Sequence, residues 1–232
     1  DVYKRQTVWV GDVKYKDISG PDDVPDGVID DYDKTNIGSP MPKFTFGWTN
    51  TFRYKNFDLS VFINGSYGNK VYNYLSMKLT HMNSPWTNQL NAVNGRAQLV
   101  PINPNKVYED GTMWYNDVSN VMVANPGASI PRATINDPND NDRISDRYIE
   151  DGSYIRLKNI SLGYTFPKKT IDKLGLSNLR IYANIQNLLT ITGYDGYDPE
   201  IGASTSSVNV YGLDNGRYPS PTVYSFGLNV SF

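Results

Sequence analysis

PSPTVYSFGLNVSF, residues 219–232, alternates apolar with small polar side chains almost without exception. One face carries Tyr224, Phe226, Leu228, Val230 and Phe232, and the other carries Ser225, Gly227, Asn229 and Ser231. This period of two predicts a β-strand with one apolar face. A strand that crosses a bilayer at a tilt needs about 9–11 residues, which this stretch supplies. Taken alone, however, the pattern fits an edge strand of a soluble sandwich equally well.

Repetition of the pattern favours the membrane interpretation. The same alternation recurs in residues 7–16, 44–54, 57–67, 151–166 and 179–190. A tight turn near Tyr54-Lys55-Asn56 joins the second and third of these stretches into a predicted hairpin. In residues 151–166 the phase slips at Lys158-Asn159, which predicts a bulge there. Residues 71–79 and 169–174 have helical spacing, and Gly175 is expected to end the second of these short helices.

The connections between the predicted strands are long and short in turn. Counted from the carboxyl terminus, residues 192–221, 69–147 and 17–42 are long, whereas residues 167–178 and the turn at 54–56 are short. All long connections therefore fall at one end of the strands. Outer-membrane barrels show this arrangement, with long loops on one rim and short turns on the other. It places the carboxyl terminus at the short-turn rim.

Composition excludes some classes of protein and leaves a barrel open. The 232 residues carry a net charge of -2 and no cysteine, so disulfides and cysteine-metal sites are absent and no basic stripe for nucleic acid is expected. Mean hydropathy is -0.50, and no apolar run approaches the ~18 residues of a membrane helix. In a transmembrane barrel only every second residue of a strand is apolar, so a low mean hydropathy does not argue against a barrel. Aromatic residues make up 13%, as interfacial girdles require.

Five motifs together resemble a known family. They are GDVKYKDISG (11–20), DGVIDDYDKTNIGSPMPKFTFGWTNTFRYKNFDLSVFINGSYGN (26–69), DGSYIRLKNISLGYTFP (151–167), NLRIYANIQNLLTITGYDGYDPEI (178–201) and SFGLNVSF (225–232). They are similar to the SusC/RagA-type TonB-linked outer-membrane transporters. The resemblance implies an all-β fold in which residues 1–232 are the C-terminal part, about six antiparallel strands, of a 22-stranded transmembrane β-barrel with long extracellular loops. The plug and the segment that engages TonB would then lie outside this chain.

The resemblance also implies a function and partners. The expected activity is TonB-dependent import of oligosaccharides or peptides across the Gram-negative outer membrane. The expected partners are a SusD-like surface lipoprotein over the barrel mouth, the barrel-assembly machinery and outer-membrane lipid. The C-terminus is expected on the periplasmic side. No catalysis and no nucleic acid are expected. The alternative is a secreted all-β module that binds glycan through aromatic loop residues.

An acidic loop is the one sequence feature with metal-binding spacing. Asp22, Asp26, Asp30 and Asp33 stand at positions 1, 5, 9 and 12 of an EF-hand-like loop, with Gly27 at position 6. Val24 at position 3 and the aspartate at position 12 depart from that pattern, and Pro21 to Pro25 interrupt the family's spacing. Calcium binding and a solvated acidic turn are both kept as interpretations. No cofactor other than Ca²⁺ is indicated.

Other candidate residues lie in the loops. The aromatic side chains expected to contact substrate, unless they only pack the loops together, are Trp86, Trp114, Tyr115, Tyr194 and Tyr197. His81 has no cysteine or second histidine nearby and is expected to be an ordinary loop residue. Asp195, Asp198 and Glu200 suggest a glycosidase carboxylate pair, but adjacent Pro and Gly favour a turn.

The alternation assigns side chains to two faces. The residues expected to face lipid are Leu59, Val61, Ile63, Ile181, Ile185, Phe226 and Leu228, and those expected to face a wet lumen are Asp58, Ser60, Asn64, Arg180, Asn184, Gln186 and Asn229. In the last strand, Tyr224, Phe226, Leu228, Val230 and Phe232 also match the signal read by the barrel-assembly machinery, as the resemblance implies. The other interpretation of Phe232 is an anchor in an aromatic girdle.

Overall fold

The computed structural model describes residues 8–201 and 210–232, which form two compact units. The sheet unit comprises residues 38–74, 149–201 and 210–232. The loop unit comprises residues 8–37 and 75–148. Each unit is described by itself. None of the helices within the described ranges is long and apolar enough to cross a membrane.

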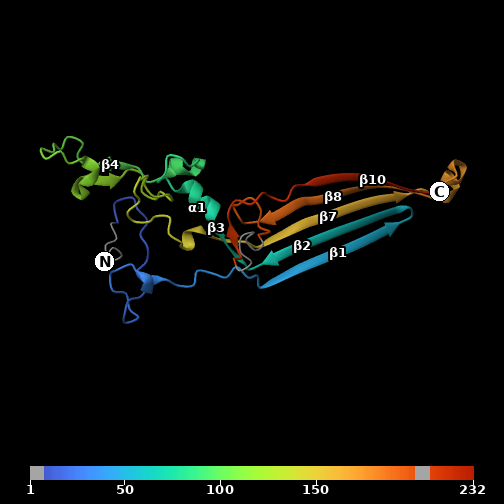
Figure 1. Cartoon of the computed structure of the whole chain (residues 1–232), viewed down its shortest axis with the longest axis horizontal. Coiled ribbons are helices and arrows are strands. Elements are labelled where there is room, and N and C mark those ends of the chain that lie inside the picture. The colour runs from blue at the N-terminus through green and yellow to red at the C-terminus, as the bar shows by residue number, and fades with distance from the viewer. Residues whose placement is uncertain (1–7, 202–209) are drawn as a thin grey trace. The chain divides into compact units, whose positions relative to one another are not determined.

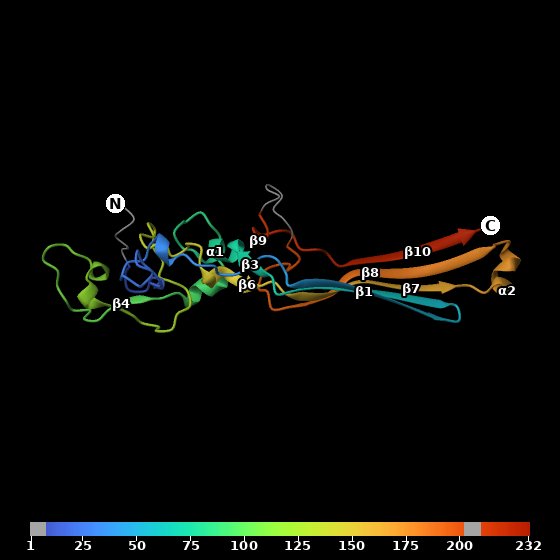
Figure 2. The same ribbon diagram turned by 90° about the horizontal axis from the view of Figure 1, so that it is seen from below.

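The sheet unit is built on a five-stranded antiparallel sheet (Figure 1). Its order is β1-β2-β7-β8-β10, with bounds Phe44–Tyr54, Phe57–Tyr67, Tyr154–Thr165, Asn178–Thr192 and Val223–Ser231. These are the predicted strands, displaced by at most a few residues. The all-β antiparallel class is confirmed. The sheet twists along its length, as the second view shows (Figure 2).

The turns lie where the sequence predicted them. β1 and β2 are joined by Lys55 and Asn56, and Lys55 adopts a left-handed backbone with φ of 52°. β7 and β8 are joined by α2 (Lys168–Ile171) and η7 (Asp172–Leu174), which end at Gly175 with φ of 69°. The carboxyl terminus lies at this same end of the sheet (Figure 1). The expected short-turn end of the sheet is therefore present.

The predicted bulge in β7 is confirmed. Asn159 pairs with Phe62 and Gln186, whereas Leu157 pairs with Ile63 and Leu189, so Lys158 is skipped in both ladders. One extra residue shifts the side-chain parity. This explains why the apolar residues of β7 change from odd to even numbers along the strand.

The prediction of a further strand over residues 7–16 is wrong for the residues that the structure describes. Residues 8–16 form no strand. Side chains and loop backbone hold this segment instead: the Val13 amide donates to Asn141 Oδ1 at 2.8 Å, and the Arg132 amide donates to the Gly11 carbonyl at 2.9 Å. The alternating side chains of this segment therefore make contacts inside the loop unit, and the segment is not a strand of the sheet. Thr7 lies outside the described residues.

The smaller elements complete the two units. The sheet unit adds a three-stranded sheet of β6 (Ile149–Asp151), β3 (Lys70–Asn73) and β9 (Leu213–Asp214). The helix predicted over 71–79 is α1 (Tyr74–Thr80), and its expected first residues belong to β3 instead. The loop unit contains η2 (Asp31–Asp33), η3 (Asn91–Gly95), β4 (Leu99–Pro101), η4 (Trp114–Asn116), η5 (Val118–Asn120), β5 (Val121–Val123) and η6 (Asp146–Tyr148).

Candidate functional site

One face of the large sheet carries a continuous band of apolar side chains. The register pairs Leu59 with Leu162, Leu162 with Ala183 and Ala183 with Phe226, so four strands contribute to one row. Phe226 is 84% exposed and Leu228 is 61% exposed. An exposed apolar surface that continues across a sheet marks contact with lipid or a partner. The two faces assigned from the sequence are thus reproduced by the register.

The opposite face is polar and carries an ion pair that spans three strands. Arg180 on β8 donates to Asp58 on β2 through Nε (3.1 Å) and Nη2 (2.6 Å). Gly163 lies between them on β7, and a Cβ there would stand 2.2 Å from Arg180 Nη2 and 2.6 Å from Asp58 Oδ1. The missing side chain therefore allows the pair to bridge over β7. Sequence alternation found both charged residues but not their contact.

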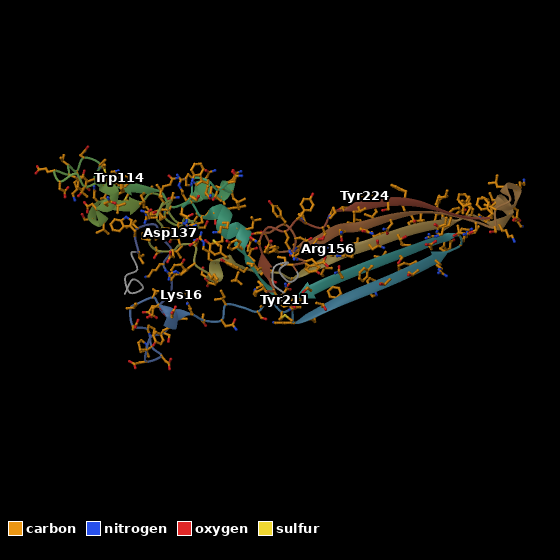
Figure 3. The ribbon with its side chains drawn as sticks, in the orientation of Figure 1. Lys16, Trp114, Asp137, Arg156, Tyr211 and Tyr224 are labelled. Carbon is orange, nitrogen blue, oxygen red and sulfur yellow. The ribbon has the colours of Figure 1, made fainter. Side chains whose placement is uncertain are left out.

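A second set of charges, the Arg156 ion cluster, lies at the loop end of β7 (Figure 3). Arg156 is 2% exposed and donates to Thr190 Oγ1 (2.8 Å), to Glu200 Oε2 (2.7 Å) and to Asp198 Oδ1, while Lys158 also donates to Glu200 (2.7 Å). Burial raises the pKa of Asp198, but hydrogen bonds from Arg156 and backbone amides outweigh it and leave that pKa below its usual value. The cluster fixes loop 193–200 onto the sheet.

The two loop tyrosines near this cluster differ. Tyr194 is 5% exposed, and its hydroxyl donates to the buried Asp214 at 2.6 Å. Burial, followed by this bond to a carboxylate, raises the pKa of Tyr194. Tyr194 therefore joins the loop after β8 to β9 and presents no ring face for a substrate, whereas Tyr197 is 64% exposed.

The acidic loop is folded by its own backbone. Asp33 accepts the amides of Ile18 (2.7 Å), Ser19 (3.2 Å) and Asp30 (2.8 Å), and these bonds, that of Ile18 first, hold the pKa of Asp33 below its usual value. Asp30 caps η2, and Asp26 accepts from the Val28 amide at 2.9 Å. The structure thus brings Asp30 and Asp33 together in a capping box.

The four aspartates do not converge on one point. Among the described residues, the one group of His, Asp and Glu whose ligand atoms all lie within 4.8 Å is elsewhere, at His81. The carboxylate of Asp33 is already bound to three amides, which leaves it poorly suited to Ca²⁺. Calcium binding by Asp22, Asp26, Asp30 and Asp33 stays a prediction.

His81 is the residue that sequence reasoning missed. It is 8% exposed, its Nε2 lies 2.8 Å from Asp137 Oδ2, and its Nδ1 lies 3.1 Å from Asp142 Oδ2. Asp137 also accepts from the backbone (2.7 Å) and side chain (2.6 Å) of Asn141. His81 Nε2 and both carboxylate oxygens of Asp137 are therefore already engaged in hydrogen bonds, while His81 Nδ1 and Asp142 Oδ2 face each other. No local sequence pattern predicts this contact, because His81 and Asp137 are 56 residues apart in the sequence.

The loop unit contains a cavity of about 1130 Å³. Its walls come from four separate segments: Trp9, residues 96–99 leading into β4, residues 114–116 of η4, and residues 132–136 with Pro138. Trp114 and Tyr115, two of the predicted substrate contacts, both line it, with their ring centroids 5.6 Å apart and their planes nearly perpendicular. Figure 3 labels Trp114. Trp86, which is 92% exposed, does not.

The last strand presents its apolar residues at an edge of the sheet. Within the described residues β10 pairs with β8 alone, and β1 pairs with β2 alone, so each leaves an outer edge. All five residues of the predicted assembly signal are exposed, from Val230 at 38% to Phe232 at 93%. Tyr224 lies on β10 in Figure 3. Two unpaired edges are a liability for an isolated sheet and favour a larger closed structure.

Curated relatives of the chain are named TonB-dependent receptors. The chain is 36% identical over 211 residues to TonB-dependent receptor P3 of Formosa agariphila, and the match covers 89% of this chain and 18% of the relative. It is 33% identical to TonB-dependent receptor P26 of the same organism (98% and 20%), and 29% identical to TonB-dependent receptor SusC of Bacteroides thetaiotaomicron (89% and 17%). The chain thus spans about a fifth of the length of these relatives. No protein-family model matches it.

Solved structures show the same fold. The RagAB peptide transporter matches with a TM-score of 0.60 at 20% identity, over 84% of this chain and 18% of that one. The RagAB peptide importer in its open-open state matches with a TM-score of 0.59 at 18% identity, over 91% and 20%. The sheet is accordingly part of a transporter-type barrel. The chain therefore belongs to the TonB-dependent receptors of the SusC/RagA type, of which it represents a segment.

Proposed function

We propose that the protein containing this chain imports nutrients across the outer membrane of a Gram-negative cell, and that residues 1–232 form the C-terminal part of its barrel. The observation that carries this proposal is the two-faced sheet. Its apolar face suits lipid, and its polar face, with the Asp58–Arg180 ion pair, suits a wet lumen. Unpaired strand edges do not persist in hydrocarbon, so the remaining strands must close the barrel.

The cargo and partners follow from the relatives. Oligosaccharides are the cargo that the family resemblance implies, and peptides are the cargo of RagAB, which is described as a peptide transporter. We propose that a SusD-like lipoprotein covers the loop side, that TonB supplies energy through a region outside this chain, and that the carboxyl terminus lies in the periplasm. The loop end of the sheet would then face outward.

Transport is favoured over glycoside hydrolysis by the state of the loop carboxylates. A glycosidase needs two carboxyl groups that face a substrate. Here Asp198 and Glu200 both accept hydrogen bonds from Arg156, which is 2% exposed. These carboxylates hold the loop in place, which supports a binding and transport role.

Uptake and localisation test the proposal. The full-length protein is expected in the outer-membrane fraction, and growth on its cargo is expected to require both this protein and TonB. Its band on a gel should shift on heating, as closed barrels do. Release of the full-length protein into the medium, soluble without detergent, would instead establish the secreted glycan-binding module.

A further inference from the structure

Four polar side chains from three walls line the cavity of the loop unit, and three of the four are exposed to solvent. Gln98, Asn116 and Asn136 come from three different walls, and none of them makes a side-chain hydrogen bond to another residue in the part of the chain that the structure describes. Arg96 makes one long bond, from Nη1 to the Val93 carbonyl at 3.4 Å, which leaves most of its donors available. Polar groups that converge in a preformed cavity are typical of a ligand site.

The cavity also carries one uncompensated positive charge. Its other described cation, Arg132, forms an ion pair with Asp12 at 2.9 Å, and none of the described residues that line the walls is acidic. Asp117, next to the wall at η4, is paired with Lys106 at 2.5 Å, which holds the pKa of Asp117 well below its usual value. Arg96 is thus the charge left for a ligand, and a guanidinium matches carboxylate or sulfate oxygens.

The walls suit sugar rings better than a peptide backbone. Trp9 and Trp114 both line the cavity, and an indole ring is a flat apolar surface of the kind against which the C–H face of a pyranose packs. A side-chain amide presents a donor beside an acceptor, which matches neighbouring hydroxyl groups. At the wall around residues 97 and 98 two backbone amides are already engaged, since the Ala97 amide donates to Ile130 O at 2.8 Å and the Gln98 amide to Asn125 Oδ1 at 2.9 Å. A peptide therefore cannot add a strand through these two amides.

Size favours an oligomer over a single sugar. The cavity of about 1130 Å³ exceeds the roughly 300–1,000 Å³ typical of small-molecule sites. From the charge, the amides and the two indole rings, we infer that this cavity binds an anionic oligosaccharide, with Arg96 on a carboxylate or sulfate group and Trp114 under a sugar ring. This inference deepens the proposed import function and rests on it.

Calorimetry on the purified full-length receptor in detergent tests the inference. The probes are a galacturonate tetrasaccharide, a sulfated galactan tetrasaccharide, a neutral galactan tetrasaccharide and a tetraglutamate peptide. At least one anionic sugar is expected to bind about tenfold more tightly than the neutral one. The two anionic probes distinguish carboxylate from sulfate recognition.

Three variants assign the contacts. Arg96→Gln is expected to lower the affinity for the anionic sugar about tenfold and to leave the neutral sugar unchanged, because it removes the charge and keeps hydrogen-bonding groups. Trp114→Ala should weaken both sugars. Lys16→Gln removes an exposed cation of the same unit outside the cavity and should change neither (Figure 3).

Several results would overturn the inference. They are binding of neither anionic sugar, equal affinity for the neutral and anionic sugars, tighter binding of the peptide, or an Arg96→Gln receptor that matches Lys16→Gln. A heat-shifted band confirms that each variant is folded. TonB-dependent growth measured in parallel separates the two proposals: uptake of a neutral glycan without anionic binding would leave import standing and reject this site.

Discussion

Replacing Leu228 by arginine tests which face of the sheet meets lipid. Leu228 is 61% exposed and lies one residue beyond Gly227, the centre of the nine-residue β10. At about 3.3 Å per residue, its side chain stands close to the middle of the strand. An arginine facing lipid at the bilayer midplane costs about 2–4 kcal/mol. We therefore expect Leu228→Arg to lower the free energy of unfolding by about that amount.

Ser225→Arg is the matched control on the other face. Ser225 lies two residues from the strand centre and pairs with the neutral Asn184. Asn229 is a less clean choice, because it pairs with Arg180 and a second arginine there would meet a like charge. If Ser225 faces water, the control should cost less than about 1 kcal/mol.

The assay is urea unfolding of the full-length protein in lipid vesicles, followed by loss of the compact band on an unheated gel. Equal destabilisation by Leu228→Arg and Ser225→Arg would refute the assignment of the faces. A larger effect for Ser225→Arg would reverse it. Either result would also remove the main support for placing the sheet in a membrane.

Three further outcomes are expected. Gly163→Ala should cost about 1 kcal/mol in urea unfolding, because the new Cβ displaces the partly buried Asp58–Arg180 pair. The folded-state pKa of Asp198 lies below its ordinary value of 3.8, so Asp198 stabilises loop 193–200 fully above pH 3.8. This stabilisation is lost as the pH falls through the lower folded-state pKa, and faster hydrogen exchange in the loop would report the loss. Deleting Phe232 should reduce the amount of folded, surface-exposed barrel in cells.

Each of these outcomes has its own control. Gly95→Ala adds a Cβ that meets nothing within 4 Å and should be nearly neutral, so an equal cost at both glycines would reject the role of the ion pair. Asp198→Asn should abolish the acid-dependent opening, and persistence of that opening would assign it to another group. Phe232→Tyr keeps the ring and should assemble normally; unchanged assembly on deletion would leave Phe232 as a girdle residue.

Local periodicity was enough to place the strands. The alternation in β1, β2, β8 and β10 predicted their bounds, and the slip at Lys158 located the bulge, because a strand reports its two faces at every second residue. The break between two alternating stretches located the turn at Lys55, and Gly175 marked the end of the other short connection because glycine readily adopts a positive φ. The same logic was wrong for residues 8–16, where alternating side chains pack within the loop unit and pair with no strand.

The loop contacts were decided by the tertiary structure alone. Arg156 meets Glu200 across 44 positions of sequence, and His81 meets Asp137 across 56. The cavity around Arg96 needs four segments brought together from residues 9 to 138. Such contacts carry no period, because irregular chain can place any residue beside any other. The sequence determines which side chains a strand turns to each face, but only the folded chain determines which distant charges and rings share a site.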